Sequence, residues 1–195
     1  MPDTLNITNI GFQKTLKSEV FCEGIGLHSG KKTSIKIMPA EVNTGISFFR
    51  QDLSENQEIK AIYENVCDTK LGTTISNKVG HKVQTIEHLM AAFFGEGVDN
   101  AFVEIDSSEI PILDGSANDF VEAIKSVGIK EQKELRNYIK VLKKVEIQDG
   151  EKYISIEPLD NDLIIDFEIV YSNPLIRTRR KEFRLSDGDL NSIYN

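Results

Sequence analysis

A glutamate followed directly by a histidine is the pair of residues in this sequence whose types best suit chemistry. Glu87 and His88 stand at the start of a stretch in which apolar residues recur at the spacing of one helical face. At about 100° per residue, His88 would point away from this face and Glu87 would lie at its edge. The pair suits a general base next to a metal ligand. A helix start with one favourable acid and one solvated histidine also explains it.

Three glycines within residues 24–30 (GIGLHSG) mark a second candidate, which includes His28. Glycine permits tight turns and a close approach of the backbone to a ligand. The segment lacks the glycine spacing and the strand–turn–helix context of a dinucleotide site. A glycine-rich connection between two strands is the alternative interpretation.

A third candidate is the segment of residues 109–117 (EIPILDGSA), which contains Asp114. Pro111 fixes an extended entry, Gly115 permits a sharp turn, and Ser116 is suited to cap a following helix. These features describe a complete corner between a strand and a helix. A role for Asp114 beyond that corner is compatible with the pattern but is not demanded by it.

The elements that must position these residues form an α+β pattern. Residues 32–38 alternate like a strand with Ile35 and Ile37 on one face, and turn residues 43–45 lead into a return strand at 46–50. Further strands are expected at residues 58–66, 71–76 and 100–106. Strands with two helices packed on one side make an α+β layer domain.

Two amphipathic helices are expected in this first part of the chain. The first covers residues 86–94, with Thr85 as its N-cap. The second covers residues 117–127, with Ser116 as its cap and Gly128 as its end. The apolar residues of both helices follow the spacing of a single buried face.

A charged stretch, residues 128–136, suits a linker to a second series of strands. This series opens with a hairpin that turns at Asp149-Gly150. Further strands are expected at residues 163–171 and 178–185. Ser186 would cap a helix that has barely begun where the chain stops. We therefore expect a first α+β domain at residues 1–134 and, at residues 135–195, the start of a second domain that is truncated here.

Composition and charge argue against several classes of protein. The 195 residues carry 31 acidic and 23 basic side chains, a net charge of -8, so bulk attraction to nucleic acid or to an anionic membrane is not expected. No apolar run approaches the roughly 20 residues that a transmembrane helix needs. Cys22 and Cys67 fit a reducing compartment better than a disulfide scaffold. We expect a cytoplasmic protein with neither a nucleic-acid partner nor a transmembrane segment.

Five segments, taken in their order and spacing, resemble the bacterial UDP-3-O-acyl-N-acetylglucosamine deacetylases. They are residues 24–32, 68–74, 85–92, 98–100 and 109–117, and the resemblance extends from about residue 17 to residue 176. Each segment alone is a weak motif, whereas their combination is specific. The resemblance implies two similar domains, each a small, mostly antiparallel sheet with two helices on one side, and an active site between the domains.

The resemblance also implies a chemistry. The family is a zinc-dependent amidase that removes the N-acetyl group from a UDP-sugar lipid precursor, in the committed step of lipid A (lipopolysaccharide) biosynthesis of Gram-negative bacteria. By this resemblance His88 is a zinc ligand and Glu87 is the general base. Leu71 and Gly72 would line the substrate cleft, and His28 and Asp114 would support the site.

The resemblance also bears on what this chain alone does. The family takes its other two zinc ligands from a His-Lys-x-x-Asp segment of the second domain, which does not occur in the 195 residues. We therefore expect the chain to be inactive without that part. We also expect it to be a monomer. Two alternatives stay open, an inactive fragment and a non-catalytic binding domain of the same fold. Similar βα layers bind RNA in ribosomal proteins, and the net charge counts against that alternative.

Overall fold

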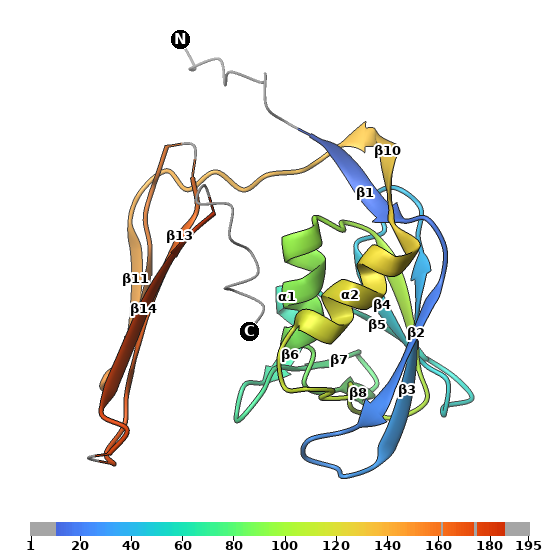
Figure 1. The fold of residues 1–195 in the computed structure, drawn as a ribbon, viewed down its shortest axis with the longest axis horizontal. Helices are drawn as coiled ribbons and strands as arrows, with labels where there is room; N and C mark the ends of the chain where they lie inside the picture. The colour runs from blue at the N-terminus through green and yellow to red at the C-terminus, as the bar shows by residue number, and fades with distance from the viewer. Residues whose placement is uncertain (1–10, 161, 174, 186–195) are drawn as a thin grey trace. The chain divides into compact units, whose positions relative to one another are not determined.

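The computed structural model describes residues 11–160, 162–173 and 175–185, which fall into two compact units (Figure 1). The first unit ends at Arg136 and the second begins at Asn137. The two described helices lie in the first unit, and the sheets are mostly antiparallel, which confirms the α+β class. In the described part of the chain, neither helix combines the length and the hydrophobicity that crossing a membrane requires.

A five-stranded sheet forms the centre of the first unit, in the order β2-β3-β9-β4-β5. Its strands are β2 (Val20–Ile25), β3 (Lys32–Pro39), β4 (Ile46–Arg50), β5 (Glu58–Lys60) and β9 (Ala101–Ile105). Ile35 lies opposite Ile105 and Ile37 opposite Val103, and all four side chains are buried. The alternating pattern of the sequence thus builds one inner face of the sheet.

Strand β4 forms at the expected residues, but it is not the return strand of a hairpin with β3. Strand β9 lies between them, antiparallel to β3 and parallel to β4. The turn before β4 exists, since Asn43 and Gly45 have φ values of 63° and 70°. The inward side chains of β9 have no exposed surface, and a central position shields both edges of such a strand.

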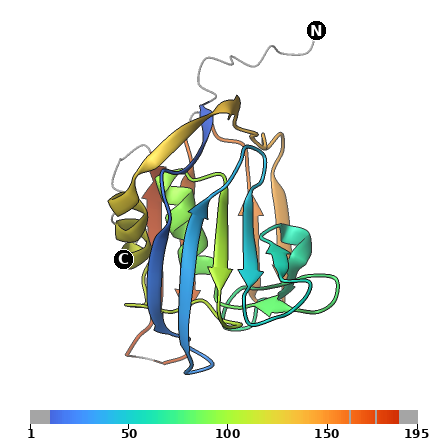
Figure 2. The same ribbon diagram turned by 90° about the vertical axis from the view of Figure 1, so that its right-hand side faces the viewer.

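Two helices, α1 (Glu87–Glu96) and α2 (Asn118–Val127), cover one face of this sheet (Figures 1 and 2). Their buried side chains are Leu89, Ala92, Phe93, Phe120, Val121 and Ile124. Gly97 ends α1 in a left-handed conformation, and Gly128 ends α2 as expected from the sequence.

The starts of the two helices differ from the expected ones. Ile86 is the N-cap of α1, and Thr85 before it has a left-handed φ of 58°, with its hydroxyl bonded to a buried carboxylate. Ala117 is the N-cap of α2, although the Ser116 hydroxyl accepts a hydrogen bond from Asn118 N at 3.1 Å. The prediction of Thr85 as a cap is therefore wrong, because its hydroxyl makes a tertiary contact instead.

The segment after α2 is a strand, so the prediction of a linker there is wrong. Strand β10 (Ile129–Leu135) pairs antiparallel with β1 (Phe12–Leu16), a strand that the sequence analysis did not expect. Most side chains of β10 are exposed, whereas Gln13, Thr15 and Leu16 of β1 are buried. A two-stranded ribbon with one solvent-exposed face tolerates charged residues on that face. The composition of β10 therefore resembles that of a linker.

A buried amide joins this β1–β10 ribbon to the central sheet. Asn100 is 1% exposed, and its side-chain nitrogen donates to Gln13 Oε1 at 2.9 Å and to Gln132 Oε1 at 2.8 Å. Its side-chain oxygen accepts a hydrogen bond from Gly45 N at 2.8 Å. One residue thus connects β1, β10 and the turn before β4.

A small three-stranded sheet completes the first unit. Its strands are β6 (Val66–Asp68), β7 (Thr74–Ser76) and β8 (Lys82–Val83). The strands expected at residues 58–66 and 71–76 are shorter than predicted, because the 3-10 turn Tyr63–Asn65 interrupts the first and the second begins only at Thr74. Leu71 has a φ of 60°, which does not fit a strand, and residues 71–73 therefore form a loop.

The second unit contains, in its described residues, two hairpins. Strand β11 (Val145–Asp149) pairs with β12 (Lys152–Ile156), and β13 (Ile164–Val170) pairs with β14 (Thr178–Arg184). The first hairpin turns at Gly150, as the Asp-Gly signal predicts. It aligns exposed apolar side chains on one face, with Val145 opposite Ile156 and Ile147 opposite Ile154. The helix start expected at Ser186 lies outside the described residues.

Candidate active site

Glu87 opens helix α1, and a contact from outside the helix orients its carboxylate. Its Oε2 accepts a hydrogen bond from Thr73 N at 2.9 Å. The side chain is half-buried, because Ile86 and Leu89 turn toward the core and Glu87 lies at the edge of that buried face. The loop of residues 71–73 and the first turn of α1 therefore form one local structure.

This loop brings three further expected site residues to Glu87. The carbonyl oxygen of Leu71 lies 3.0 Å from His28 Nε2, and since a carbonyl only accepts, the imidazole donates from Nε2. A Cβ at Gly72 would lie 3.2 Å from Glu87 Oε1 and 3.8 Å from His28 Nε2. Glycine at position 72 thus keeps a side chain away from the carboxylate.

His88 is half-buried beside this group, and Asp114 lies within its electrostatic reach. The pKa of Asp114 is lowered, first by hydrogen bonds from the backbone N–H (2.8 Å) and the hydroxyl (2.9 Å) of Ser116 and to a smaller degree by the charge of His88. Asp114 is itself exposed. Its hydrogen bonds to Ser116 serve the corner before α2, and its position also brings it near His88.

A buried carboxylate, Glu109, opens the third candidate segment, although the sequence predicted no role for it. Glu109 has no exposed surface and accepts hydrogen bonds from His28 N and Ser29 N at 2.8 Å each, and from the Thr85 hydroxyl at 3.2 Å. Burial alone raises the pKa of a carboxyl, but these donors outweigh it and hold the pKa of Glu109 below its ordinary value. The one signal in the sequence is an acidic residue at the head of the apolar run EIPIL.

Three non-glycine residues of the segments that form the candidate site have left-handed backbone conformations. Leu71, Thr85 and Leu113 have φ values of 60°, 58° and 51°, which non-glycine residues rarely adopt. Each such residue costs about 1–3 kcal/mol and persists where its surroundings impose it. Two of the three flank Glu87 in space or in sequence, since Leu71 belongs to its loop and Thr85 stands two residues before it. The backbone around Glu87 is therefore held in place by tertiary contacts.

The described residues do not complete a metal site. Within residues 11–160, 162–173 and 175–185, no three His, Cys, Asp or Glu side chains are grouped so that they could hold an ion. A catalytic zinc takes three protein ligands. His88 therefore fits the role of one ligand of such a centre, and the described residues do not supply a complete set of three.

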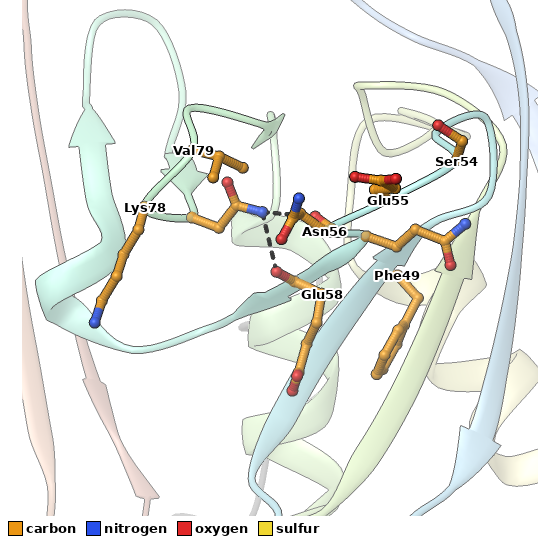
Figure 3. A pocket seen from close by; sticks show the side chains of 9 residues that line it. Phe49, Ser54, Glu55, Asn56, Glu58, Lys78 and Val79 are labelled. Carbon is orange, nitrogen blue, oxygen red and sulfur yellow. Dashed lines mark hydrogen bonds between the residues drawn. The ribbon is translucent and has the colours of Figure 1, made fainter.

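A shallow depression of about 540 Å³ lies elsewhere in the first unit (Figure 3). Its walls come from residues 54–58 and from the turn at residues 77–79, and Phe49 also lines it. The Asn77 side chain joins these walls by donating to the backbone oxygens of Asn56 at 2.7 Å and Glu58 at 3.2 Å. The residues that line it include neither Glu87 nor His88, so the depression is separate from the candidate site.

Comparisons with known proteins place the chain in a family. A family model described as UDP-3-O-acyl N-acetylglycosamine deacetylase matches residues 13–193. A relative from Syntrophus aciditrophicus named UDP-3-O-acyl-N-acetylglucosamine deacetylase is 43% identical over 176 residues, which are 90% of this chain and 55% of the relative. A relative of the same name from Shewanella halifaxensis is 46% identical over 165 residues, which are 85% of this chain and 54% of the relative.

The chain thus spans about half the length of the curated relatives it matches. The match covers both units, since it begins near β1 and continues past β14. The resemblance noted in the sequence is confirmed. The chain belongs to the UDP-3-O-acyl N-acetylglycosamine deacetylase family.

Proposed function

We propose that this chain is part of a zinc-dependent hydrolase that removes the N-acetyl group from UDP-3-O-acyl-N-acetylglucosamine. The observation that carries the proposal is the orientation of Glu87, whose carboxylate is bound by Thr73 N beside Gly72, with His88 next in the chain. The names of the relatives support the substrate and the reaction.

Glu87 is the proposed general base. The bond from Thr73 N engages Oε2, and Oε1 faces Gly72, where no side chain blocks its approach. A carboxylate in this position is suited to take the proton of a water that attacks the amide carbonyl. A positioned general base of this kind contributes about 10²- to 10⁴-fold in rate. Leu71 and Gly72 would line the cleft through which the substrate reaches it.

His88 is the proposed zinc ligand of this chain. The remaining ligands would come from the part of the family that lies beyond these residues. Asp114 is the proposed support of His88, since it lies within electrostatic reach and carboxylates commonly orient histidine ligands. Bound zinc would supply Lewis-acid activation of the amide.

We further propose a cytoplasmic monomer that acts on a UDP-sugar lipid precursor in lipid A biosynthesis of a Gram-negative bacterium. Family membership supports the precursor and the pathway. The free cysteines Cys22 and Cys67 fit a reducing compartment. The net charge of -8 supports the absence of a nucleic-acid partner.

The test separates the roles of the two adjacent residues. It uses the extended protein, by which we mean this chain followed by the part of the family that it does not cover. Glu87→Gln should lower kcat by about 10²- to 10⁴-fold while zinc content and substrate binding stay near those of the parent, because the amide keeps the size but does not accept the proton. His88→Ala should lose zinc as well as rate. Acetate release and metal analysis measure both.

Glu96→Gln is the matched control, since it makes the same change at the other end of α1. It should leave kcat unchanged. If Glu87→Gln strips the zinc, Glu87 is a ligand and not the base. If the extended protein itself releases no acetate, the chain belongs to an inactive member of the fold, which is the alternative left open above.

A further inference from the structure

We propose that Glu109 is a positioning residue that holds Glu87 from two sides. The inference rests on the proposed function in one respect, namely that Glu87 is the base. Nothing in the structure brings Glu109 to the reacting atoms, because its side chain has no exposed surface. Its action on Glu87 passes through His28 and Thr85.

The surroundings of Glu109 are built for a charged carboxylate. Oε1 accepts from His28 N and the Thr85 hydroxyl, and Oε2 accepts from Ser29 N. Three donors converge on two oxygens, so that a neutral amide of the same shape would place its N–H₂ group against a donor. The fit is therefore specific for charge as well as for size.

The first connection to Glu87 runs through His28. Glu109 binds the backbone N–H of His28, and the imidazole of His28 donates from Nε2 to the carbonyl of Leu71 at 3.0 Å. Two residues later, Thr73 N donates to Glu87 Oε2. The exposed histidine ring thus connects a buried carboxylate to the loop that orients the base.

The second connection runs through Thr85, two residues before Glu87. The bond from its hydroxyl to Glu109 fixes a residue with a φ of 58°, which is the turn by which the chain enters α1. Ile86 N also donates to Thr73 O at 3.3 Å, so the helix start and the loop are joined directly as well. Both connections from Glu109 therefore converge on Glu87.

Gly26 shows how closely the backbone approaches this carboxylate. A Cβ at position 26 would collide with Glu109 Oε2 and with the Ser29 hydroxyl. Gly26 itself is not in the left-handed region, so space, and not backbone conformation, requires a glycine there. The backbone at Gly26 is thus fitted closely to the Glu109 carboxylate.

A first experiment tests the connection without any enzymatic assay. In the 195-residue chain, ¹⁵N NMR in alkaline buffer, where imidazoles are neutral, should show His28 in the Nε2–H tautomer. Glu109→Gln should convert it to a mixture of tautomers. Glu104→Gln, which removes a surface carboxylate paired with Lys36, should leave the tautomer unchanged. An unchanged tautomer in Glu109→Gln would overturn the connection through His28.

A second experiment measures the effect on the base in the extended protein. Glu109→Gln should lower kcat by about 10²-fold with zinc retained and KM little changed, since a misplaced catalytic group costs about this much. Thr85→Val keeps the shape and removes only the hydroxyl, so it decides the question if Glu109→Gln does not fold, and it should lower kcat by a smaller factor. Reduced stability with an unchanged kcat per zinc-loaded molecule would mean that Glu109 serves the fold alone.

The two experiments distinguish this inference from the proposed function. An inactive extended protein with an altered His28 tautomer would refute the deacetylase and retain the positioning network. An active protein whose kcat does not respond to Glu109→Gln or Thr85→Val would retain the deacetylase and refute the network.

Discussion

At the scale of single residues, the buried carboxylate of Glu109 couples stability to pH. Its pKa in the folded chain lies below the ordinary value, because the donors that surround it outweigh the effect of burial. A lowered folded pKa contributes stability that is fully present above the unfolded pKa, about 4.3, and is lost as the pH falls through the folded pKa. The first unit should therefore lose stability in mild acid.

The variant Glu109→Gln isolates this contribution. Its deficit in the free energy of unfolding relative to the parent should be largest at neutral pH and should shrink as the pH falls through the unfolded pKa, about 4.3, and on through the lower folded pKa. Urea unfolding at several pH values measures it. Some acid sensitivity will remain, since the Arg50 guanidinium also lowers the pKa of Asp52. A deficit that stays constant over this range would show that Glu109 is not stabilised as an anion.

Only local patterns can be read from the sequence. They predicted part of the candidate site, and they missed Glu109 because its role depends on distant residues. Glu87 and His88 stand out because their types are reactive and because helical spacing alone places Glu87 at the edge of a buried face and His88 away from it. The role of Glu109 depends on donors about 80 positions earlier in the chain, at His28 and Ser29. No local pattern reports which carboxylate will meet such donors.

At the scale of elements, the unexpected feature is the ribbon of β1 and β10. Hydrogen bonds of the Asn100 side chain join this ribbon to the central sheet. The Asn100 side chain makes three hydrogen bonds while 1% exposed. Removing it takes a hydrogen-bond partner from the half-buried Gly45 N–H and from the buried side chain of Gln13. An unsatisfied buried group of this kind costs about 1–3 kcal/mol.

We therefore expect Asn100→Ala to lower the free energy of unfolding by about 1–3 kcal/mol and to loosen the ribbon before the sheet. Asn65→Ala is the control, since its amide makes an exposed hydrogen bond to Lys60 O, and it should cost less than about 0.5 kcal/mol. Urea unfolding gives both values. Equal losses in the two variants would show that the buried network adds little.

The elements themselves were predicted far better than their pairing. Periodicity located β3, β4, β9 and both helices because each buries one face. The position of β9 between β3 and β4 depends on long-range strand pairing, which no local pattern of the sequence reports. Strand β10 was missed because its side chains are mostly exposed and its stability comes from backbone pairing, which composition does not report.

At the scale of the whole chain, the two units differ in how much they bury. Strand β9 is paired along both edges and its inward side chains have no exposed surface. Strand β12 is paired along one edge in the described structure, and all of its side chains are exposed. Isolated two-stranded hairpins are marginally stable in water.

Hydrogen exchange should resolve this difference. Amides of Ala101–Ile105 should exchange slowly, at the rate of global unfolding, while those of Lys152–Ile156 should exchange fast through local opening. Mass spectrometry of peptides from the two strands measures the rates. Equal protection would mean that the second unit is stabilised by contacts that the described residues do not show.

Metal content is a second property of the whole chain. Since the described residues offer no group of three ligands, dialysed protein should retain well under one zinc per chain, measured by elemental analysis. A stoichiometric zinc that survives a chelator would contradict this. It would imply that one of the other two histidines of the chain, His28 or His81, joins His88 and that the ligand assignment is wrong.

The apolar face of the β11–β12 hairpin also governs how copies of the chain behave together. Val145, Ile147, Ile154 and Ile156 lie exposed on one side of a ribbon whose outer backbone edges have no partner in the described residues. Such an edge is a template for strand addition between molecules. The net charge of -8 opposes this association by repulsion, and salt screens repulsion over distances of about 10 Å at 0.1 M. Solubility of the chain should therefore be highest in dilute buffer and should fall as ionic strength rises.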